Sequence, residues 1–358
     1  MNSIELRKII GIFLTFGIMS VAQVGWAQQP EVASQTQARD IPAKKVPVPT
    51  TLSPELTRVV AEPIPAIPTL KTSDQWRQAQ KSLDTARTEL TMKLAASTGA
   101  KIEEIQIAGV RCHRVTPAEI SKGFENRLLV HVHGGAFVLG GGLAGAMEAV
   151  LVSNATGCVS LSIDYRMPPD HPFPAALDDV VNVWKELTKS HSAKTMALYG
   201  TSAGGGLVLS TIHKLKQGSI PLPAAIFAGT PVSDMTKTGD SYYTNSEICN
   251  GLGRYEGFLE DAFRIYAGAQ DMHSPLLSPI YGDTAGFPPT LLISGTRDLF
   301  LSNTVRMHRK LRESNIPCDL HVYEAQSHAD YLKAFDARES KDAMREIREF
   351  FDKHLEHQ

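Results

Sequence analysis

The sequence has no excess of charge of either sign, and it has few cysteines. Among its 358 residues, 36 Lys and Arg stand against 38 Asp and Glu, which gives a formal net charge of −2. Proteins that bind nucleic acid usually carry a clear basic excess, so we expect no nucleic-acid partner. The four cysteines form no CxxC pair and are Cys112, Cys158, Cys249 and Cys318. We therefore expect no metal site, and buried free thiols are favoured over disulfides.

Long hydrophobic runs are also absent after the first residues. Near the N-terminus, two basic residues precede an apolar stretch at 9–22, which is shorter than the roughly 20 residues of a membrane-spanning helix. Small residues follow at Gly25 and Ala27, in the pattern of a signal-peptide cleavage site. We expect residues 1–27 to be a cleaved signal peptide, and the mature chain to be periplasmic or secreted with no stable membrane span. An uncleaved membrane anchor is the alternative.

The next segment is rich in proline and poor in periodic apolar residues. Eight of the 21 prolines fall between residues 28 and 70, which is typical of an extended leader. We expect residues 28–72 to form a flexible leader and residues 73–358 to form one folded domain. Ser73 or Asp74 is expected to cap a helix that runs to residue 98.

From residue 101 onward, short apolar strands alternate with amphipathic helices. Strands that are apolar throughout indicate a mainly parallel sheet covered on both faces, so the chain is predicted to be an α/β protein. A strand pair at 102–108 and 110–115 turns near Gly109, which suggests an antiparallel edge. An irregular insertion at about 235–285 breaks the alternation. Because a long insertion in a regular domain is often functional, we expect a lid there.

A serine motif follows the strand expected at 196–199. It reads Gly-Thr-Ser-Ala-Gly over residues 200–204 and has the form G-x-S-x-G, with a helix of small residues after it. This is the context of a nucleophile elbow, in which a sharp turn holds the serine above the sheet. Ser202 is therefore the candidate nucleophile, and a chance match to a short motif is the alternative.

A glycine-rich loop follows a second buried strand and reads His-Val-His-Gly-Gly-Ala-Phe from residue 131. Acyl transfer develops an oxyanion that preorganised backbone N–H groups can bind, and glycines let the backbone approach closely. We assign these donors to Gly134, Gly135 and Ala203. His131 is expected to be a core residue and His133 a brace for the loop, because no third ligand supports a metal site.

Two further residues complete a catalytic set in the chain order serine, acid, histidine. Asp298 follows the strand expected at 290–294, and His328 follows the strand expected at 319–324. Since the carboxyl ends of parallel strands share one edge of the sheet, both should lie beside Ser202. His328 is expected to accept the serine proton while Asp298 orients the imidazole. The alternatives are a helix-capping role for Asp298 and a surface position for His328.

A second glycine pattern indicates a different chemistry but lacks its context. Gly140, Gly142 and Gly145 fit G-x-G-x-x-G, and Asp164 follows at the spacing of the ribose-binding acid of dinucleotide sites. That motif should start directly after a strand, whereas a short segment separates it from the strand ending near His133. We therefore expect no dinucleotide, and the predicted chemistry needs no metal or organic cofactor.

Together these residues resemble the hormone-sensitive-lipase-like branch of the α/β-hydrolases, which includes bacterial carboxylesterases. The resemblance covers about residues 75–355. It rests on the loop, the serine motif, Asp298, His328 and the segment Asp-Tyr-Arg-Met-Pro-Pro-Asp-His-Pro-Phe-Pro-Ala at 164–175. It implies an α/β-hydrolase fold, with a mostly parallel central sheet, flanking helices and a helical cap built from about 73–99 and 235–285.

The resemblance also implies a function. A carboxylesterase-type serine hydrolase would cleave an ester through an acyl-enzyme intermediate. Ala136 stands where the family usually has glycine, and Thr201 stands where many members have aspartate. We place Ala136 and Phe137 at the substrate pocket, where the added methyl group of Ala136 favours short-chain acyl esters or small lactones. An amidase or peptidase on the same fold and a non-catalytic ligand-binding protein are the alternatives, and a homodimer is left open.

Overall fold

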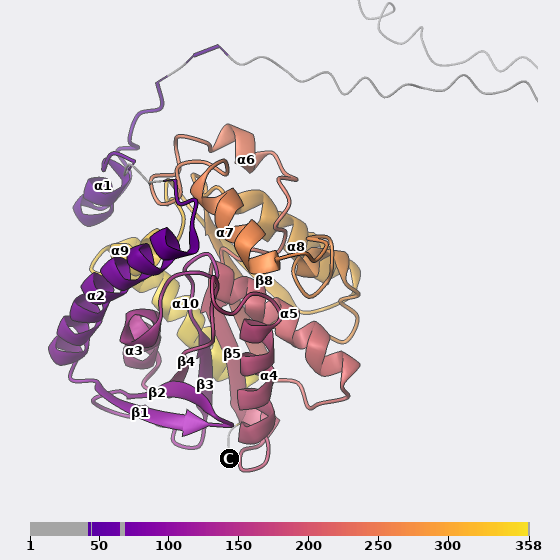
Figure 1. Cartoon of the computed structure of the whole chain (residues 1–358). Helices are drawn as coiled ribbons and strands as arrows, with labels where there is room; N and C mark the ends of the chain where they lie inside the picture. Colours follow the sequence, from indigo (N-terminus) through magenta and orange to yellow (C-terminus); the bar gives the residue numbers. More distant parts are fainter. Residues whose placement is uncertain (1–41, 44, 65–68, 357–358) are drawn as a thin grey trace, which may run out of the picture. The chain divides into compact units, whose positions relative to one another are not determined.

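The computed structural model describes residues 42–43, 45–64 and 69–356. The chain divides into two units, Met1–Lys45 and Val46–Gln358, and every element discussed below lies in the second (Figure 1). The expected signal peptide at 1–27 lies outside the described residues. Over the described ranges, no helix combines the length and the apolar character needed to cross a membrane.

An 8-stranded sheet forms the centre of this unit, in the order β1-β2-β4-β3-β5-β6-β7-β8. β2 runs antiparallel to both β1 and β4, whereas the other neighbouring strands are parallel. The strands are β1 (Lys101–Ile107), β2 (Val110–Thr116), β3 (Leu128–Val132), β4 (Val159–Ile163), β5 (Met196–Thr201), β6 (Ala225–Gly229), β7 (Thr290–Gly295) and β8 (Cys318–Tyr323). This confirms the α/β class with a mostly parallel sheet and an antiparallel edge.

Helices cover both faces of the sheet (Figure 1). They are α1 (Pro54–Val60), α2 (Ser73–Thr98), α3 (Met147–Thr156), α4 (Ala175–Leu187), α5 (Ala203–Gln217), α6 (Ser241–Thr244), α7 (Phe258–Ala267), α8 (Leu301–Glu313), α9 (Asp330–Lys333) and α10 (Arg338–His354). Short 3-10 helices lie at Gly142–Ala146, Ala193–Thr195 and Pro279–Tyr281.

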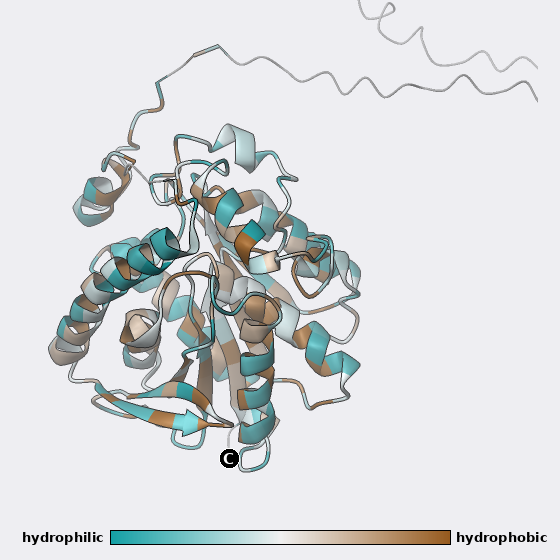
Figure 2. Cartoon of the chain, viewed as in Figure 1, coloured by the Kyte–Doolittle hydropathy of each residue, from teal (hydrophilic) through white to brown (hydrophobic). Residues whose placement is uncertain are grey.

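Each face of the sheet has its own apolar core, because alternate residues of a strand point to opposite faces. Leu198 and Ile226 pack with α4 and α5 on one face, while Tyr199 and Phe227 pack with α3 and α10 on the other. The strands β4 to β7 are buried along their whole length. This explains their continuous apolar runs, and Figure 2 shows the apolar strands inside helices whose polar sides face outward.

Helix α2 is capped one residue earlier than expected. Thr72, rather than Ser73 or Asp74, is its cap: Thr72 Oγ1 accepts from the Gln75 N–H, and Gln75 Oε1 accepts from the Thr72 N–H. This reciprocal pair satisfies two donors that the first helical turn leaves unpaired. At the other end Gly99 has a left-handed φ of 72°, which lets the chain leave the helix towards β1.

The structure differs from the sequence expectation within the leader. The sequence predicts a flexible segment over 28–72, but Pro54–Val60 form helix α1. Ser53 donates its backbone N–H and its hydroxyl to the Glu339 carboxylate, at 2.9 and 2.6 Å. Leu56 and Val60 are buried against alanines between β8 and α10. Leu56 and Val60 are four residues apart, so they form one buried face of the short helix. The high proline content of the segment gives no sign of this helix.

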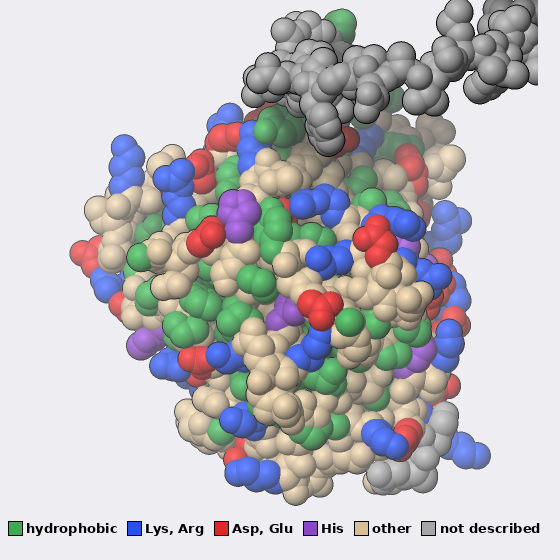
Figure 3. Space-filling view, turned by 90° about the vertical axis from the view of Figure 1, so that its right-hand side faces the viewer, with side chains coloured by type: hydrophobic (Ala, Val, Ile, Leu, Met, Phe, Trp, Pro, Cys, Tyr) green, Lys and Arg blue, Asp and Glu red, His purple; other side chains and the backbone are tan. Residues whose placement is uncertain are grey.

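Charged side chains of both signs are interspersed over the face of the molecule in Figure 3. This distribution agrees with the formal net charge of −2. The face shown therefore presents no patch of a single sign that would attract a polyanion.

Candidate active site

Ser202 lies at the turn between β5 and α5. Its backbone has φ 64° and ψ −124°, a conformation that a non-glycine residue adopts only where the surrounding structure enforces it. A Cβ atom on Gly200 or Gly204 would lie 2.2 or 2.0 Å from the Val132 carbonyl oxygen, so only glycine fits on either side of the turn. The chain thus forms the nucleophile elbow that the G-x-S-x-G motif predicts.

Ser202, His328 and Asp298 form a hydrogen-bonded chain at the carboxyl edge of the sheet. Ser202 Oγ lies 2.8 Å from His328 Nε2, and His328 Nδ1 lies 3.0 Å from Asp298 Oδ1. An ionised carboxylate only accepts, so Nδ1 carries the proton and Nε2 accepts from the serine hydroxyl. Asp298 follows β7 and His328 follows β8. The structure therefore brings together the three residues that the sequence singles out.

The Asp298 carboxylate is fully buried and well supplied with donors. Besides His328, Oδ1 accepts from the Phe300 N–H at 3.0 Å, while Oδ2 accepts from the hydroxyls of Ser294, at 2.9 Å, and Thr230. Burial alone would raise the pKa of this carboxyl, but the charge of His328 and these hydrogen bonds outweigh burial and hold the pKa below its ordinary value. Asp298 therefore stays ionised behind the imidazole.

Sequence reasoning missed Thr230 and Asn245, which hold the acid and the histidine in place. Thr230 follows β6 directly, and its Oγ1 lies 3.0 Å from His328 Nδ1. Asn245 Nδ2 donates to the backbone carbonyl oxygens of Asp298, at 2.8 Å, and Thr296, at 3.2 Å. The position of Thr230 directly after a buried parallel strand is a usable signal, because such positions face the same edge as Ser202. No comparable signal marks Asn245 within the insertion.

The glycine loop after β3 passes directly beside the serine. A Cβ atom on Gly134 would lie 3.3 Å from Ser202 Cβ. Gly135 has φ 118°, and a Cβ atom there would lie 2.2 Å from the Leu139 carbonyl oxygen, so glycine is required. Among the described residues, the backbone N–H groups of Gly134, Gly135 and Ala203 have no protein acceptor. These three groups can therefore donate to an oxygen that enters the site.

Helix α2 holds the far end of the same loop. Gln80 Nε2 donates to the Val138 carbonyl oxygen at 2.7 Å, and Asp84 accepts the N–H groups of Gly140 and Gly141 at 2.9 and 3.1 Å. Burial raises the pKa of the Asp84 carboxyl, and the two amide hydrogen bonds oppose that shift. Two polar residues four apart on one helix thus position the segment that carries the candidate oxyanion donors.

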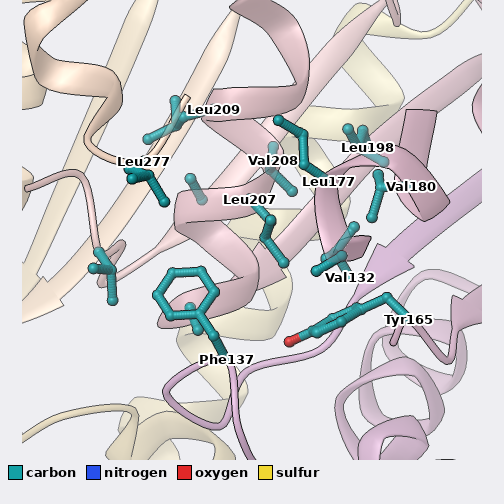
Figure 4. Packing of buried hydrophobic residues seen from close by; sticks show 14 of the residues in the cluster. Val132, Phe137, Tyr165, Leu177, Val180, Leu198, Leu207, Val208, Leu209 and Leu277 are labelled. Carbon is teal, nitrogen blue, oxygen red and sulfur yellow. The ribbon is translucent and has the colours of Figure 1, made fainter. Parts of the chain in front are cut away.

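Phe137 does not line the cavity beside Ser202, contrary to the sequence prediction, whereas Ala136 does. The Phe137 side chain is 1% exposed, and its ring stacks on Tyr266 with centroids 4.2 Å apart. Figure 4 shows the ring among core residues such as Leu207. Ala136 and Phe137 both have left-handed φ angles, 53° and 65°. Two such residues in succession reverse the chain, so the Phe137 ring points into the core.

The two histidines of the loop have structural positions, as expected. His131 is fully buried, and its Nε2 lies 3.1 Å from Glu148 Oε2. His133 stacks on Tyr165 with centroids 4.0 Å apart, and its Nδ1 lies 2.8 Å from the Gly134 carbonyl oxygen. Burial lowers the pKa of His133 to about 4, so the ring is neutral at pH 7.

Two of the three glycines of the G-x-G-x-x-G pattern, Gly140 and Gly145, pack against His133. A Cβ atom on Gly140 would lie 2.8 Å from His133 Nδ1, and one on Gly145 would lie 2.9 Å from the same ring. These glycines are therefore required by close packing of the loop.

A buried polar chain runs beside the elbow from the residue that precedes the serine. Thr201 Oγ1 donates to Glu148 Oε1 at 2.6 Å and lies 2.5 Å from the Tyr331 hydroxyl. Glu148 is thus bound to both Thr201 and His131. Thr201, which stands where many members of the family have aspartate, therefore links β5 to α3 and α9.

A cavity of about 570 Å³ opens beside Ser202 and His328, a volume typical of small-ligand sites. The cavity is lined by residues of both segments that are expected to form the cap. Helix α2 contributes Ala79, Leu83, Arg87 and Leu90, and the insertion contributes Gly251, Leu252, Phe258, Leu259 and Phe263. The rings of Trp76 and Phe258 lie 5.5 Å apart, so the two segments contact each other.

The described residues contain no group of three or more His, Cys, Asp or Glu side chains that could hold a metal ion. The four cysteines are buried free thiols. Burial raises the pKa of Cys112 to about 12 and that of Cys249 to about 11, so these thiols are protonated and unreactive at neutral pH.

The fold and the serine, histidine and acid at its sheet edge define a serine hydrolase with an α/β-hydrolase fold. The chain belongs to the α/β-hydrolase fold family, whose family model matches residues 129–332 and so includes Ser202, Asp298 and His328. It is a hydrolase of the carboxylesterase type.

Solved structures and a curated relative agree with this membership. The crystal structure of esterase E25 has a TM-score of 0.87 at 43% identity and covers 89% of this chain and 99% of that one. An esterase from the bacterial hormone-sensitive lipase family has a TM-score of 0.72 at 27% identity, with 85% and 99% covered. An esterase of Acinetobacter venetianus is 25% identical over 285 residues, which are 79% of this chain and 92% of that protein.

Proposed function

We propose that the protein hydrolyses esters with short acyl groups, of about C2 to C6, and small lactones, through an acyl-enzyme formed on Ser202. One observation carries the proposal: Ser202 Oγ lies 2.8 Å from His328 Nε2 at the wall of a cavity, with the buried Asp298 behind the imidazole.

Acylation begins when Ser202 Oγ attacks the ester carbonyl carbon and its proton moves to His328 Nε2. The carbonyl oxygen becomes an oxyanion, which the N–H groups of Gly134, Gly135 and Ala203 bind. The ionised Asp298 stabilises the imidazolium that forms. The C–O bond to the alcohol then breaks, and the departing oxygen takes the proton from His328. The acyl group is left on Ser202.

Deacylation repeats these steps with water. His328 takes a proton from a water molecule whose oxygen attacks the acyl carbon, and the second oxyanion is bound by the same N–H groups. Collapse of this intermediate breaks the bond to Ser202 Oγ, which takes the proton back from His328. The products are a carboxylic acid and the free enzyme.

The walls of the cavity support the preference for short acyl groups. Ala136 lines the cavity next to the candidate oxyanion donors and adds a methyl group there. The buried rings of Phe263 and Phe300 line it as well. A methylene that fits such a site adds under about 1 kcal/mol, while one that displaces closely packed side chains costs more.

A series of p-nitrophenyl esters from C2 to C16, assayed below micelle-forming concentrations with small lactones alongside, tests the proposal. We expect the highest kcat/KM between C2 and C6. Faster hydrolysis of C12 to C16 esters than of C4 would contradict the short-chain preference. A p-nitroanilide with the same acyl group tests the amidase alternative. An amidase would hydrolyse this anilide about as fast as the corresponding ester.

We further propose that the chain is exported and cleaved after residue 27, which the pattern of basic, apolar and small residues at 1–27 supports. N-terminal sequencing of protein from the periplasm and medium of a bacterial host tests this. A mature chain starting at residue 28 is expected, and a cytoplasmic chain that keeps its first residues would contradict it.

A further inference from the structure

The cavity beside Ser202 contains a cationic side chain that the hydrolytic steps do not use. Arg87 lies on α2 and lines the cavity together with Leu83 and Leu90 of the same helix. Over the described ranges, no carboxylate lies within salt-bridge distance of its guanidinium, and no acceptor forms a hydrogen bond with it. Arg87 therefore has donors available to a molecule in the cavity.

Asp84 and the charged side chains of the cavity wall other than Arg87 are bound to other partners. Asp84, three residues earlier on α2, accepts two backbone N–H groups of the glycine loop. Glu148, on the cavity wall, accepts from the Thr201 hydroxyl and contacts His131. The other cation of the wall, Lys333, lies 3.2 Å from the buried Asp330 carboxylate. Arg87 is thus the cation of this cavity wall that lacks a directly bound acid within the described part of the chain.

The position of Arg87 makes an anionic ligand favourable. Its side chain is exposed to solvent and lines the cavity. Burial lowers the pKa of the guanidinium, and the charge of Asp84 offsets only part of that effect. The guanidinium is charged at any physiological pH. Its attraction to an anion is stronger here than on an open surface, because fewer water molecules screen it.

We propose that Arg87 binds a carboxylate carried by the substrate, so that the preferred substrates are short esters with a second, ionised carboxyl group. The inference rests on the proposed esterase function and narrows it. The guanidinium fork matches a planar carboxylate with two parallel N–H···O bonds. Leu83 and Leu90 are 42% and 46% exposed, and they offer apolar surface for the carbon atoms between the ester and the carboxylate.

Matched pairs of esters, in which a carboxylate is exchanged for a carboxamide of the same shape, test the proposal. For a carboxylate on the alcohol side, the pair is 4-carboxyphenyl acetate and 4-carbamoylphenyl acetate. For a carboxylate on the acyl side, the pair is monomethyl glutarate and methyl 4-carbamoylbutanoate. Product release, followed by chromatography at low and at high salt, provides kcat/KM for each ester.

We expect the unaltered protein to have a kcat/KM about tenfold higher for the carboxylate in at least one pair, which is the size of a partly solvated charged hydrogen bond. High salt should reduce this ratio. Arg87→Gln should bring the ratio close to one, and the neutral ester of each pair corrects for any general effect of the substitution on the cavity. Arg77→Gln is the matched control, because Arg77 lies on the same helix outside the cavity and pairs with Asp74 and Asp170. Its ratio should stay unchanged.

Inhibition of p-nitrophenyl butyrate hydrolysis by glutarate, with glutaramide as the neutral control, needs no variant and so does not depend on how Arg87→Gln folds. We expect glutarate to inhibit more strongly at low salt. Equal inhibition by the two compounds, or ratios in both ester pairs that Arg87→Gln leaves unchanged, would overturn the role of Arg87. If the unaltered protein hydrolyses neither the neutral esters nor p-nitrophenyl butyrate, the proposed esterase function itself fails.

Discussion

The hydroxyl oxygen of Thr230 lies 3.0 Å from His328 Nδ1 while its proton points to the Asp298 carboxylate. The imidazole N–H is therefore shared between Asp298 Oδ1 and Thr230 Oγ1. Thr230 follows β6 directly and is 1% exposed, so the sheet fixes its position between the acid and the base. Thr230 thus positions the imidazole that is hydrogen-bonded to Ser202, although its own hydroxyl is bonded to Asp298 and His328.

Replacing Thr230 tests this arrangement. Thr230→Val keeps the shape but removes a donor to Asp298, and it should lower kcat about tenfold with little change in KM. Because the Thr230 hydrogen bond helps to keep the pKa of Asp298 low, its loss should raise that pKa. The part of the acid limb of the kcat profile that comes from protonation of Asp298 should then move to higher pH.

Thr230→Ser restores the hydroxyl and is the control, with expected activity within a few-fold of the unaltered protein. An equal loss in both variants, with no shift of the acid limb, would mean that Thr230 acts only through packing.

Ser202→Ala should remove nearly all esterase activity and all covalent labelling by an organophosphate, because the methyl group cannot form an acyl-enzyme. The variant should stay folded, since alanine fits the same turn between β5 and α5. Peptide mapping after labelling of the unaltered protein checks the assignment, and a label on a different serine would refute it.

Asp298→Asn should lower kcat by up to roughly 10⁴-fold while the fold survives, because an amide favours the wrong imidazole tautomer. The buried position should tolerate the isosteric side chain, and a circular dichroism melting curve verifies folding. Turnover near that of the unaltered protein would assign the role of the acid to another carboxylate.

Ala136→Gly should broaden the range of accepted acyl groups towards longer chains, because it removes a methyl group from the cavity wall. Ala136 has a left-handed φ of 53°, which glycine adopts without strain. The variant should therefore be no less stable in denaturant unfolding. An unchanged chain-length profile from C2 to C12 would show that Ala136 does not bound the acyl group.

The stability of the protein should fall in mild acid because of buried neutral histidines. Burial lowers the pKa of His213 from 6.5 to about 4, and its Nε2 lies 3.0 Å from the Pro279 carbonyl oxygen. Between these two pH values the unfolded chain binds a proton that the folded chain does not, so the free energy of unfolding decreases as the pH falls. His133 contributes in the same direction.

Denaturant unfolding at pH 7 and pH 5 measures this effect. His213→Asn should reduce the stability difference between the two pH values by up to about 2 kcal/mol, because its proton uptake on unfolding is removed. Between pH 7 and pH 9 the difference between the variant and the unaltered protein should stay constant. An identical acid dependence in both would exclude His213 as a source of it.

Much of the fold and of the site follows from local sequence patterns. Strands that are buried on both faces must be apolar throughout, so β4 to β7 stand out as short hydrophobic runs between amphipathic helices. Ser202 stands out because its turn leaves no room for a side chain at Gly200 and Gly204. Asp298 and His328 stand out because each lies in the loop that follows a parallel strand, and these loops share one edge of the sheet. Each of these requirements lies within a few residues of the position it constrains.

Other features depend on residues that are far apart in the chain. Phe137 points into the core because two residues with left-handed backbone conformations turn the loop, and because its ring stacks on Tyr266 of α7. Helix α1 forms because Glu339 and the alanines before α10 meet a short helix within a proline-rich segment. No local periodicity encodes either partner.

The sequence by itself determined the class of fold, the serine, histidine and acid at the sheet edge, and the glycine loop beside them, because each of these is written in the identity and spacing of neighbouring residues. Only the tertiary structure decided that Thr230 positions His328 and that Arg87 lines the cavity with no acid bound to it among the described residues. Both depend on distances between elements that are remote in sequence, and those distances are set by how the helices and strands pack.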